Sequence, residues 1–265
     1  MELPIFQVDA FTDRVFTGNP AAVMPLSGWL DDATLQAIAM ENNLSETAFM
    51  VEAGAGYELR WFTPTVEVEL CGHATLAAAH VLFEHLGYSG EILVFQTRSG
   101  ELRVHRAGAG FTLDFPANEL APTEVDTAIC DALGGMASEA LAVGPNAHSL
   151  LYVYEFEEDV ARLSPNFPAL CAVSAQCVIA TAPGNDCDFV SRFFAPQFGV
   201  DEDPVTGSAH CSLVPYWAGR LQSHQLQARQ ISARGGNLAC MLRDSRVLMT
   251  GNAVTFLRGT VTLAA

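Results

Sequence analysis

Basic residues are scarce in this sequence, and no basic run is present. The 265 residues include 13 Lys and Arg against 30 Asp and Glu, which gives a formal net charge of -17. A chain of this charge repels nucleic acids and anionic membranes. We therefore expect no nucleic acid and no membrane among its partners.

Long apolar runs and paired cysteine motifs are also missing. No apolar stretch reaches the roughly 20 residues that a membrane-spanning helix needs. The segment 1–6 lacks the basic start and apolar run of a signal peptide. The 7 cysteines are odd in number, scattered and without a Cys-x-x-Cys pair, which argues against a disulfide framework or a structural zinc site. These features predict a cytoplasmic protein with reduced thiols.

The segment 69–75, Glu-Leu-Cys-Gly-His-Ala-Thr, has the pattern of a strand end, a glycine turn and the first turn of an apolar helix. Backbone N–H groups at a helix start lack intrahelical acceptors, and the helix dipole adds partial positive charge there. Such a site binds a carboxylate or a phosphate. Here it is flanked by the thiol of Cys71 and the imidazole of His73. A similar turn is predicted at 203–210, Asp-Pro-Val-Thr-Gly-Ser-Ala-His.

Glu46 is the candidate for proton transfer. The segment 45–51 alternates as a strand, and Glu46 shares one face with Ala48 and Met50. If that apolar face is buried, desolvation disfavours the carboxylate anion and suits the group to acid–base chemistry near neutral pH. A solvent-facing glutamate on an edge strand is the alternative interpretation of the same pattern.

An internal repeat predicts the architecture. Arg-Trp-Phe-Thr-Pro at 60–64 is echoed by Arg-Phe-Phe-Ala-Pro at 192–196, and each copy leads through an acidic loop into a turn and an Ala/Leu-rich helix. The first helix is apolar nearly all round, which is typical of a buried helix. We predict an α+β fold of two pseudo-symmetric halves, 1–118 and 119–265, each a rolled, mainly antiparallel sheet around a central buried helix. The cleft between the halves is the expected active site, as ligand sites commonly lie at such interfaces.

Separated motifs occur in order along the whole chain. They are Phe-Thr-Gly-Asn-Pro at 16–20, Asn-Leu-Ser-Glu-Thr-Ala-Phe at 43–49, Leu-Cys-Gly-His-Ala-Thr at 70–75, Arg-Phe-Phe-Ala-Pro at 192–196, Glu-Asp-Pro-Val-Thr-Gly-Ser-Ala-His at 202–210 and Gly-Asn-Ala-Val at 251–254. In these motifs and their order the sequence resembles the phenazine-biosynthesis PhzF-like family. The resemblance implies a diaminopimelate-epimerase-like fold, a homodimer, a biosynthetic isomerase, and neither cofactor nor metal.

The resemblance also assigns roles to individual residues. Glu46 falls where the family has its proton-transfer glutamate. The positions matched to substrate binding are His73, Asp203, Ser208, Gly72, Gly207, Asn19 and Cys71. Asp203 and Ser208 also have a structural interpretation as helix caps. The predicted activity is an isomerisation in which Glu46 moves a proton on a small carboxylate-bearing substrate, while the two helix starts bind the acid group.

Three other functions remain open from the sequence. A cofactor-free racemase or epimerase would use Cys71 as one of two thiols, but the second turn has no thiol at the matching place, and Cys211 lies inside the helix. Metal-dependent hydrolysis through Cys71, His73, His210 and Cys211 matches no familiar ligand spacing. A binding or interaction module on the same fold is the non-catalytic alternative, which the presence of Glu46 disfavours.

Overall fold

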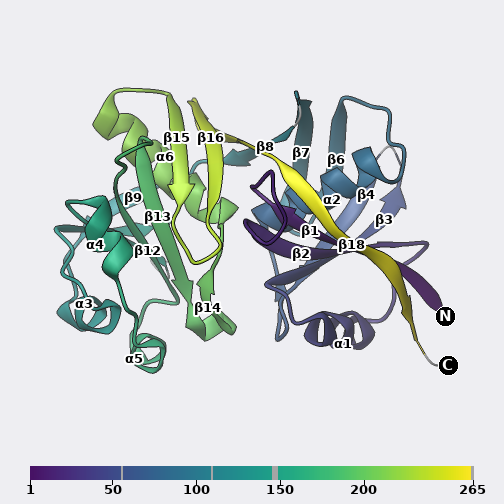
Figure 1. Cartoon of the computed structure of the whole chain (residues 1–265), viewed down its shortest axis with the longest axis horizontal. Helices are drawn as coiled ribbons and strands as arrows, with labels where there is room; N and C mark the ends of the chain where they lie inside the picture. Colours follow the sequence, from purple (N-terminus) through teal and green to yellow (C-terminus); the bar gives the residue numbers. More distant parts are fainter. Residues whose placement is uncertain (55, 109, 145–148, 264–265) are drawn as a thin grey trace. The chain divides into compact units, whose positions relative to one another are not determined.

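The computed structural model describes residues 1–54, 56–108, 110–144 and 149–263. The chain divides into two compact units (Figure 1). Unit 1 contains Met1–Asp114 and returns at Thr250, and unit 2 is Phe115–Met249. The predicted division was 1–118 and 119–265, so the segment from Thr250 onward lies in unit 1 and not, as predicted, in the C-terminal half.

The described part of unit 1 contains one sheet and two helices. Its strands follow each other in the pairing order β18, β1, β2, β3, β4, β6, β7 and β8, and the short β5 pairs with β4. The bounds are β1 (Glu2–Ala10), β2 (Asn19–Leu26), α1 (Asp32–Asn42), β3 (Glu46–Ala53), β4 (Gly56–Phe62), β5 (Glu67–Val68), α2 (Gly72–Glu84), β6 (Ile92–Thr97), β7 (Gly100–Ala107), β8 (Gly110–Pro116) and β18 (Ala253–Thr262). The helix α1 packs against β3 and β4, and the buried helix α2 packs against β1, β2, β3 and β18.

The last strand explains why the division differs from the predicted one. β18 pairs antiparallel with β1 from Glu2↔Thr262 to Ala10↔Ala253, so the two ends of the chain lie side by side (Figure 1). This pairing joins residues separated by almost the whole chain, so no local sequence pattern predicts it.

Unit 2 repeats the pairing pattern of unit 1. Its strands follow the order β9, β10, β11, β12, β13, β15 and β16, and the short β14 pairs with β13. The bounds are β9 (Leu120–Thr123), α3 (Thr127–Leu133), β10 (Glu139–Val143), β11 (Ser149–Val153), α4 (Glu157–Arg162), α5 (Phe167–Ala172), β12 (Cys177–Pro183), β13 (Phe189–Ala195), η1 (Pro196–Phe198), β14 (Val200–Asp203), α6 (Gly207–Leu221), β15 (Gln225–Gln230), β16 (Gly236–Arg243) and β17 (Arg246–Gly251).

The sheets of the two units have their parallel strand pairs at equivalent places in the pairing order. In unit 1, β2 pairs parallel with β3 and β4 pairs parallel with β6. In unit 2, β11 pairs parallel with β12 and β13 pairs parallel with β15. The short strands β5 and β14 hold the same place, directly before α2 and α6. The predicted α+β fold of two pseudo-symmetric halves is confirmed.

The central helices are buried as the sequence predicts. Every residue of α2 from Gly72 to Phe83 is buried, because alanine, leucine and valine occupy all of its faces. α6 buries Trp217, Leu213 and Ala209 among others. A helix with apolar residues on every side has no solvent face and lies inside its sheet. In the described part of the chain, no helix is long and apolar enough to cross a membrane.

Candidate active site

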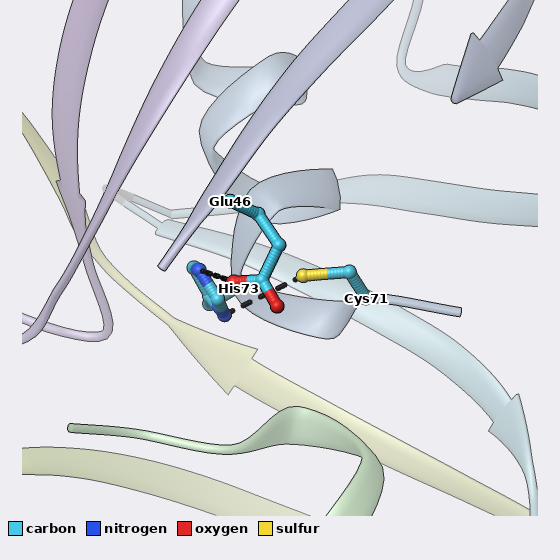
Figure 2. A group of neighbouring side chains, drawn as sticks. All are labelled: Glu46, Cys71 and His73. Atoms are coloured by element: carbon cyan, nitrogen blue, oxygen red, sulfur yellow. Dashed lines mark hydrogen bonds and ion pairs between the residues drawn. The ribbon is translucent and has the colours of Figure 1, made fainter. Parts of the chain in front are cut away.

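Glu46, Cys71 and His73 come together in unit 1. Glu46 is the first residue of β3, Cys71 is the N-cap of α2, and His73 lies in the first turn of that helix. Figure 2 shows the three side chains pointing toward one another, and one ligand-type atom from each lies within 4.8 Å of the others. All three are among the site residues predicted from the sequence.

The contact between Glu46 and His73 is the shortest in this group. Glu46 Oε2 lies 3.0 Å from His73 Nε2, and the two side chains are 14% and 3% exposed. The two atoms are in contact, but neither has a hydrogen bond with good alignment. Buried polar groups are normally paired, so this site holds hydrogen-bonding capacity that a ligand can use.

The other ring nitrogen of His73 faces Asn19 and Cys71. Asn19 Nδ2 lies 3.0 Å from His73 Nδ1, and Cys71 Sγ lies 3.5 Å from the same nitrogen. Asn19 is completely buried. Sequence reasoning assigned Asn19 to substrate binding by resemblance, and the structure places its amide on the imidazole.

Burial acts on both titratable groups beside Glu46. Burial raises the pKa of the Cys71 thiol to about 11, and the nearby Glu46 carboxylate adds to this effect. The thiol therefore keeps its proton near neutral pH. Burial alone lowers the pKa of His73, but Cys71 and Glu46 raise it well above its usual range. Cys71 attracts a protonated His73 ring by charge only when it is a thiolate. Near neutral pH the thiol is protonated, so the Glu46 carboxylate is the charged neighbour that raises the pKa of His73.

The donor types of this group suit a thiophilic metal ion, since zinc binds cysteine sulfur, imidazole nitrogen and carboxylate oxygen. One observation weighs against such an ion: the Nδ1 atom of His73, which faces Cys71 Sγ, already contacts Asn19 Nδ2.

The second predicted turn lies in unit 2 and is built differently. Asp203 Oδ2 accepts a hydrogen bond of 2.5 Å from Thr206 Oγ1. Gln230 Nε2 donates to the Asp203 carbonyl at 2.7 Å, and Gln230 Oε1 accepts from the Thr206 N–H at 2.8 Å. Ser208 is partly exposed in the first turn of α6. Sequence reasoning missed Gln230, because it lies on β15, far from the motif and without a motif of its own.

Gly72 and Gly207 are the first residues of α2 and α6. Cys71 and Thr206, the N-caps before them, have extended backbones and side chains that do not cap. In both turns the first N–H groups of the helix therefore lack a side-chain cap from the N-cap residue, as an anion-binding helix start requires. Whether the two turns share one cleft stays a prediction.

The fold and the site together define an α+β protein of two similar units with a buried carboxylate–imidazole contact in unit 1. Among solved structures, a PhzF-family phenazine biosynthesis protein from Enterococcus faecalis matches with a TM-score of 0.94 and 46% identity, covering 99% of this chain and 100% of that one. A structure described as a probable proline racemase from Agrobacterium radiobacter K84 shares the fold at 10% identity, with a TM-score of 0.66 over 99% of this chain and 93% of that one.

The sequence comparisons give the family itself. The family profile PhzC-PhzF, described as phenazine biosynthesis-like protein, matches residues 8–259. An uncharacterized isomerase of Pseudomonas aeruginosa is 53% identical over the full length of both chains. The human phenazine biosynthesis-like domain-containing protein is 43% identical over 99% of this chain and 100% of its own. The chain belongs to the phenazine biosynthesis-like PhzC-PhzF family.

Proposed function

We propose that this chain is a cofactor-independent isomerase that moves a proton on a small carboxylate-bearing substrate. Glu46 is the general acid and base, and His73 is the principal side-chain donor to the substrate. The observation that carries the proposal is the buried contact of 3.0 Å between Glu46 Oε2 and His73 Nε2. A carboxylate in such a place can take a proton and return it, because it is largely shielded from water.

The chemistry follows from these groups without an added reagent. Glu46 removes a proton from a carbon next to a double bond, and the electron pair shifts along the conjugated system toward the substrate's acid group. His73 Nε2–H and the N–H groups at the start of α2 stabilise the developing negative charge. Glu46 then returns the proton to the far end of the system. Atoms and electrons balance, since the bond broken and the bond formed are both C–H.

The basic side chains limit the alternatives. All 13 Lys and Arg residues are arginines. No ε-amino group is therefore present in this sequence to form a Schiff base with a substrate or an aldehyde cofactor. This agrees with a reaction that uses only acid–base groups.

The second candidate is a racemase or epimerase that uses Cys71, and the fold shared with a proline racemase favours it. The protonated Cys71 thiol, with a pKa of about 11, disfavours it. Thr206 holds the equivalent N-cap in unit 2 and has no thiol. A binding protein without catalysis is the third candidate. In such a protein Glu46 and His73 would bind a ligand and transfer no proton.

Proton exchange in heavy water tests the proposal. The protein is incubated with a panel of cyclic and unsaturated carboxylic acids, hydroxyanthranilate-like compounds and amino acids, and deuterium incorporation is followed by NMR. We expect exchange that is lost in Glu46→Gln and kept in Cys71→Ser. Exchange lost in Cys71→Ser and kept in Glu46→Gln would establish the racemase instead. Binding of the acids without any exchange would favour the binding protein.

The family resemblance also supports a homodimer in the cytoplasm, which we propose as the working form. Light scattering on the purified full chain tests the dimer, and a particle of one chain's mass, 28.4 kDa, would contradict it.

A further inference from the structure

His73 has two different environments at its two ring nitrogens. Nδ1 faces Asn19 Nδ2 at 3.0 Å and Cys71 Sγ at 3.5 Å. An amide NH₂ group can only donate, and a protonated thiol has its hydrogen to donate. An imidazole nitrogen that faces two donors is an acceptor and carries no hydrogen. Nε2 faces the Glu46 carboxylate, which only accepts.

Asn19 is held in this position by the loop before it. It is the first residue of β2 and pairs with Ala10 of β1. Gly18 precedes it with φ +69, and a Cβ atom there would lie 2.3 Å from the Ala10 carbonyl oxygen. Only glycine fits that approach, so the backbone delivers Asn19 to His73 in one position. The Phe-Thr-Gly-Asn-Pro motif thus serves His73, 54 residues away.

We propose that Asn19 is a positioning residue that fixes the tautomer of His73: in the neutral ring, Nδ1 accepts from the Asn19 amide and the proton lies on Nε2. This N–H lies on the Glu46 side of the ring, makes no aligned hydrogen bond to that carboxylate, and is available to the acid group of the substrate. The proposal rests on the proposed function for its consequence, since it makes His73 a donor and leaves Glu46 as the only proton carrier. The tautomer itself is a property of the protein without substrate.

The charged and titratable groups that face His73 act in opposite directions. Glu46, from β3, favours a second proton on the ring, and Cys71, from the start of α2, is neutral while its thiol is protonated. Asn19, from β2, opposes the second proton, because an amide N–H cannot accept from an Nδ1–H. Replacing this donor by an acceptor should therefore raise the pKa of His73 and favour a hydrogen on Nδ1.

Nitrogen-15 NMR of the imidazoles in the full chain tests this directly, because a protonated and an unprotonated ring nitrogen have different shifts. The His73 signals are assigned by their loss in His73→Gln. Because the pKa of His73 is raised well above its usual range, the ring is measured above its own titration midpoint, where it is neutral, and we expect it to carry its hydrogen on Nε2 there. His210 is the internal reference: its Nδ1 lies 2.8 Å from the Thr206 carbonyl oxygen, so it carries its hydrogen on Nδ1.

The decisive variant is Asn19→Asp, which keeps the shape and replaces the donor by an acceptor. We expect a hydrogen on His73 Nδ1 and a higher titration midpoint for this ring, with His210 unchanged. Asn118→Asp is the matched control, since Asn118 donates to Ser212 Oγ in unit 2. If the variant is unfolded, the wild-type tautomer alone decides. A neutral wild-type His73 ring with its hydrogen on Nδ1, or an Asn19→Asp ring that titrates as in wild type, would overturn the proposal.

The catalytic consequence is measured separately. For any acid of the panel that exchanges with wild type, Asn19→Asp should slow exchange by about 10²-fold at a pH above the titration midpoint of its His73, where the hydrogen lies on Nδ1 and Nε2 no longer donates, the usual cost of losing one charge-stabilising donor. A Nε2–H tautomer together with no exchange by wild type would support the role of Asn19 and contradict the proposed isomerase. Unchanged exchange in a folded variant with an altered tautomer would contradict the catalytic consequence.

Discussion

The helix starts of unit 1 and unit 2 have the same backbone and different side chains. Glu46 opens β3 opposite Ala21 of β2, and Cys177 opens β12 opposite Ser149 of β11. By this register, Cys177 is the counterpart of Glu46. Counting from the helix starts, Thr206 is the counterpart of Cys71 and Ser208 that of His73.

The structural ion pairs of the two units, in contrast, are retained. Arg60 binds Glu67 through two hydrogen bonds in unit 1, and Arg192 binds Glu202 in the same way in unit 2. Such a bidentate pair fixes the short strand that precedes each helix. The repeat therefore preserves the support of the helix start, and only unit 1 has a carboxylate and an imidazole at the equivalent chemical positions.

The fourth residue of each central helix, Thr75 in α2 and His210 in α6, has a structural role. Thr75 Oγ1 donates to the Cys71 carbonyl at 2.5 Å, and His210 Nδ1 donates to the Thr206 carbonyl at 2.8 Å. His210 is thus the counterpart of Thr75 and closes the first helical turn. Burial lowers the pKa of His210 to about 4, whereas the net effect at His73 is upward. The neighbouring Glu46 carboxylate, which His210 lacks, is one cause of the opposite pKa shifts of the two histidines.

The largest expected effect comes from Glu46→Gln, which removes the group that distinguishes unit 1. We expect proton exchange to fall by about 10²- to 10⁴-fold, the usual contribution of a positioned acid–base group. Glu52→Gln, on the exposed end of the same strand, is the control and should exchange as wild type. Equal losses in both variants would show that the effect comes from the strand and not from the carboxylate.

His73→Gln and its counterpart Ser208→Ala test the asymmetry directly. The first should slow exchange by about 10²-fold, since it removes a charge-stabilising donor from a buried site. The second should slow it by about 10-fold or less, the value of an ordinary hydrogen bond. Exchange rates of the two variants on the same acid are compared. Losses of the same size would contradict a site centred on unit 1.

Acid should destabilise the fold through the structural histidine. An unfolded His210 binds a proton near pH 6.5 and the folded one only near pH 4, so the unfolded state binds more protons between these values. Stability is fully present above pH 6.5 and falls as pH drops toward 4, by about 3 kcal/mol for this residue. Urea unfolding at a series of pH values measures the slope.

The matched variant is His210→Asn, whose amide can still donate to the Thr206 carbonyl. Its stability should depend less steeply on pH than that of wild type over the same range. His80, whose pKa burial also lowers to about 4, keeps part of the slope. A slope that is unchanged in the variant would assign the acid sensitivity to other groups.

Cys71→Ser should have the smallest effect. The thiol is protonated near neutral pH and contacts His73 Nδ1 at 3.5 Å, a place where a hydroxyl can donate as well. We expect the exchange rate to change by about 3-fold or less, within the value of one neutral hydrogen bond. A loss comparable to that of Glu46→Gln would give Cys71 the chemical role that the racemase alternative assigns to it.

Much of the fold was predictable because its signals are local. The all-apolar pattern after His73 predicts the buried helix, and the echo of 60–64 at 192–196 predicts the repeat, which the strand pairing confirms. Glu46, Cys71 and His73 were found because each lies in a short motif. The alternation at 45–51, however, predicts one buried face, and the structure buries 47–50 on both faces.

The rest depends on contacts between distant parts of the chain. The amide of Asn19 meets His73 across 54 residues, and Gln230 reaches Asp203 across 27. A lone Asn or Gln has no periodicity or spacing that would reveal such a partner. The return of β18 to β1 has the same cause, because strand pairing across the whole chain is decided by the assembled sheet.

The most direct test of the central claim is the fate of the transferred hydrogen. An acid that exchanges in the panel is deuterated at the exchanging carbon and converted in ordinary water, and NMR locates the label in the product. Glu46 is only 14% exposed, so we predict that part of the label reappears at the new carbon. Glu46→Gln should abolish this transfer. Conversion by Glu46→Gln at the wild-type rate, with the same distribution of label, would contradict the account.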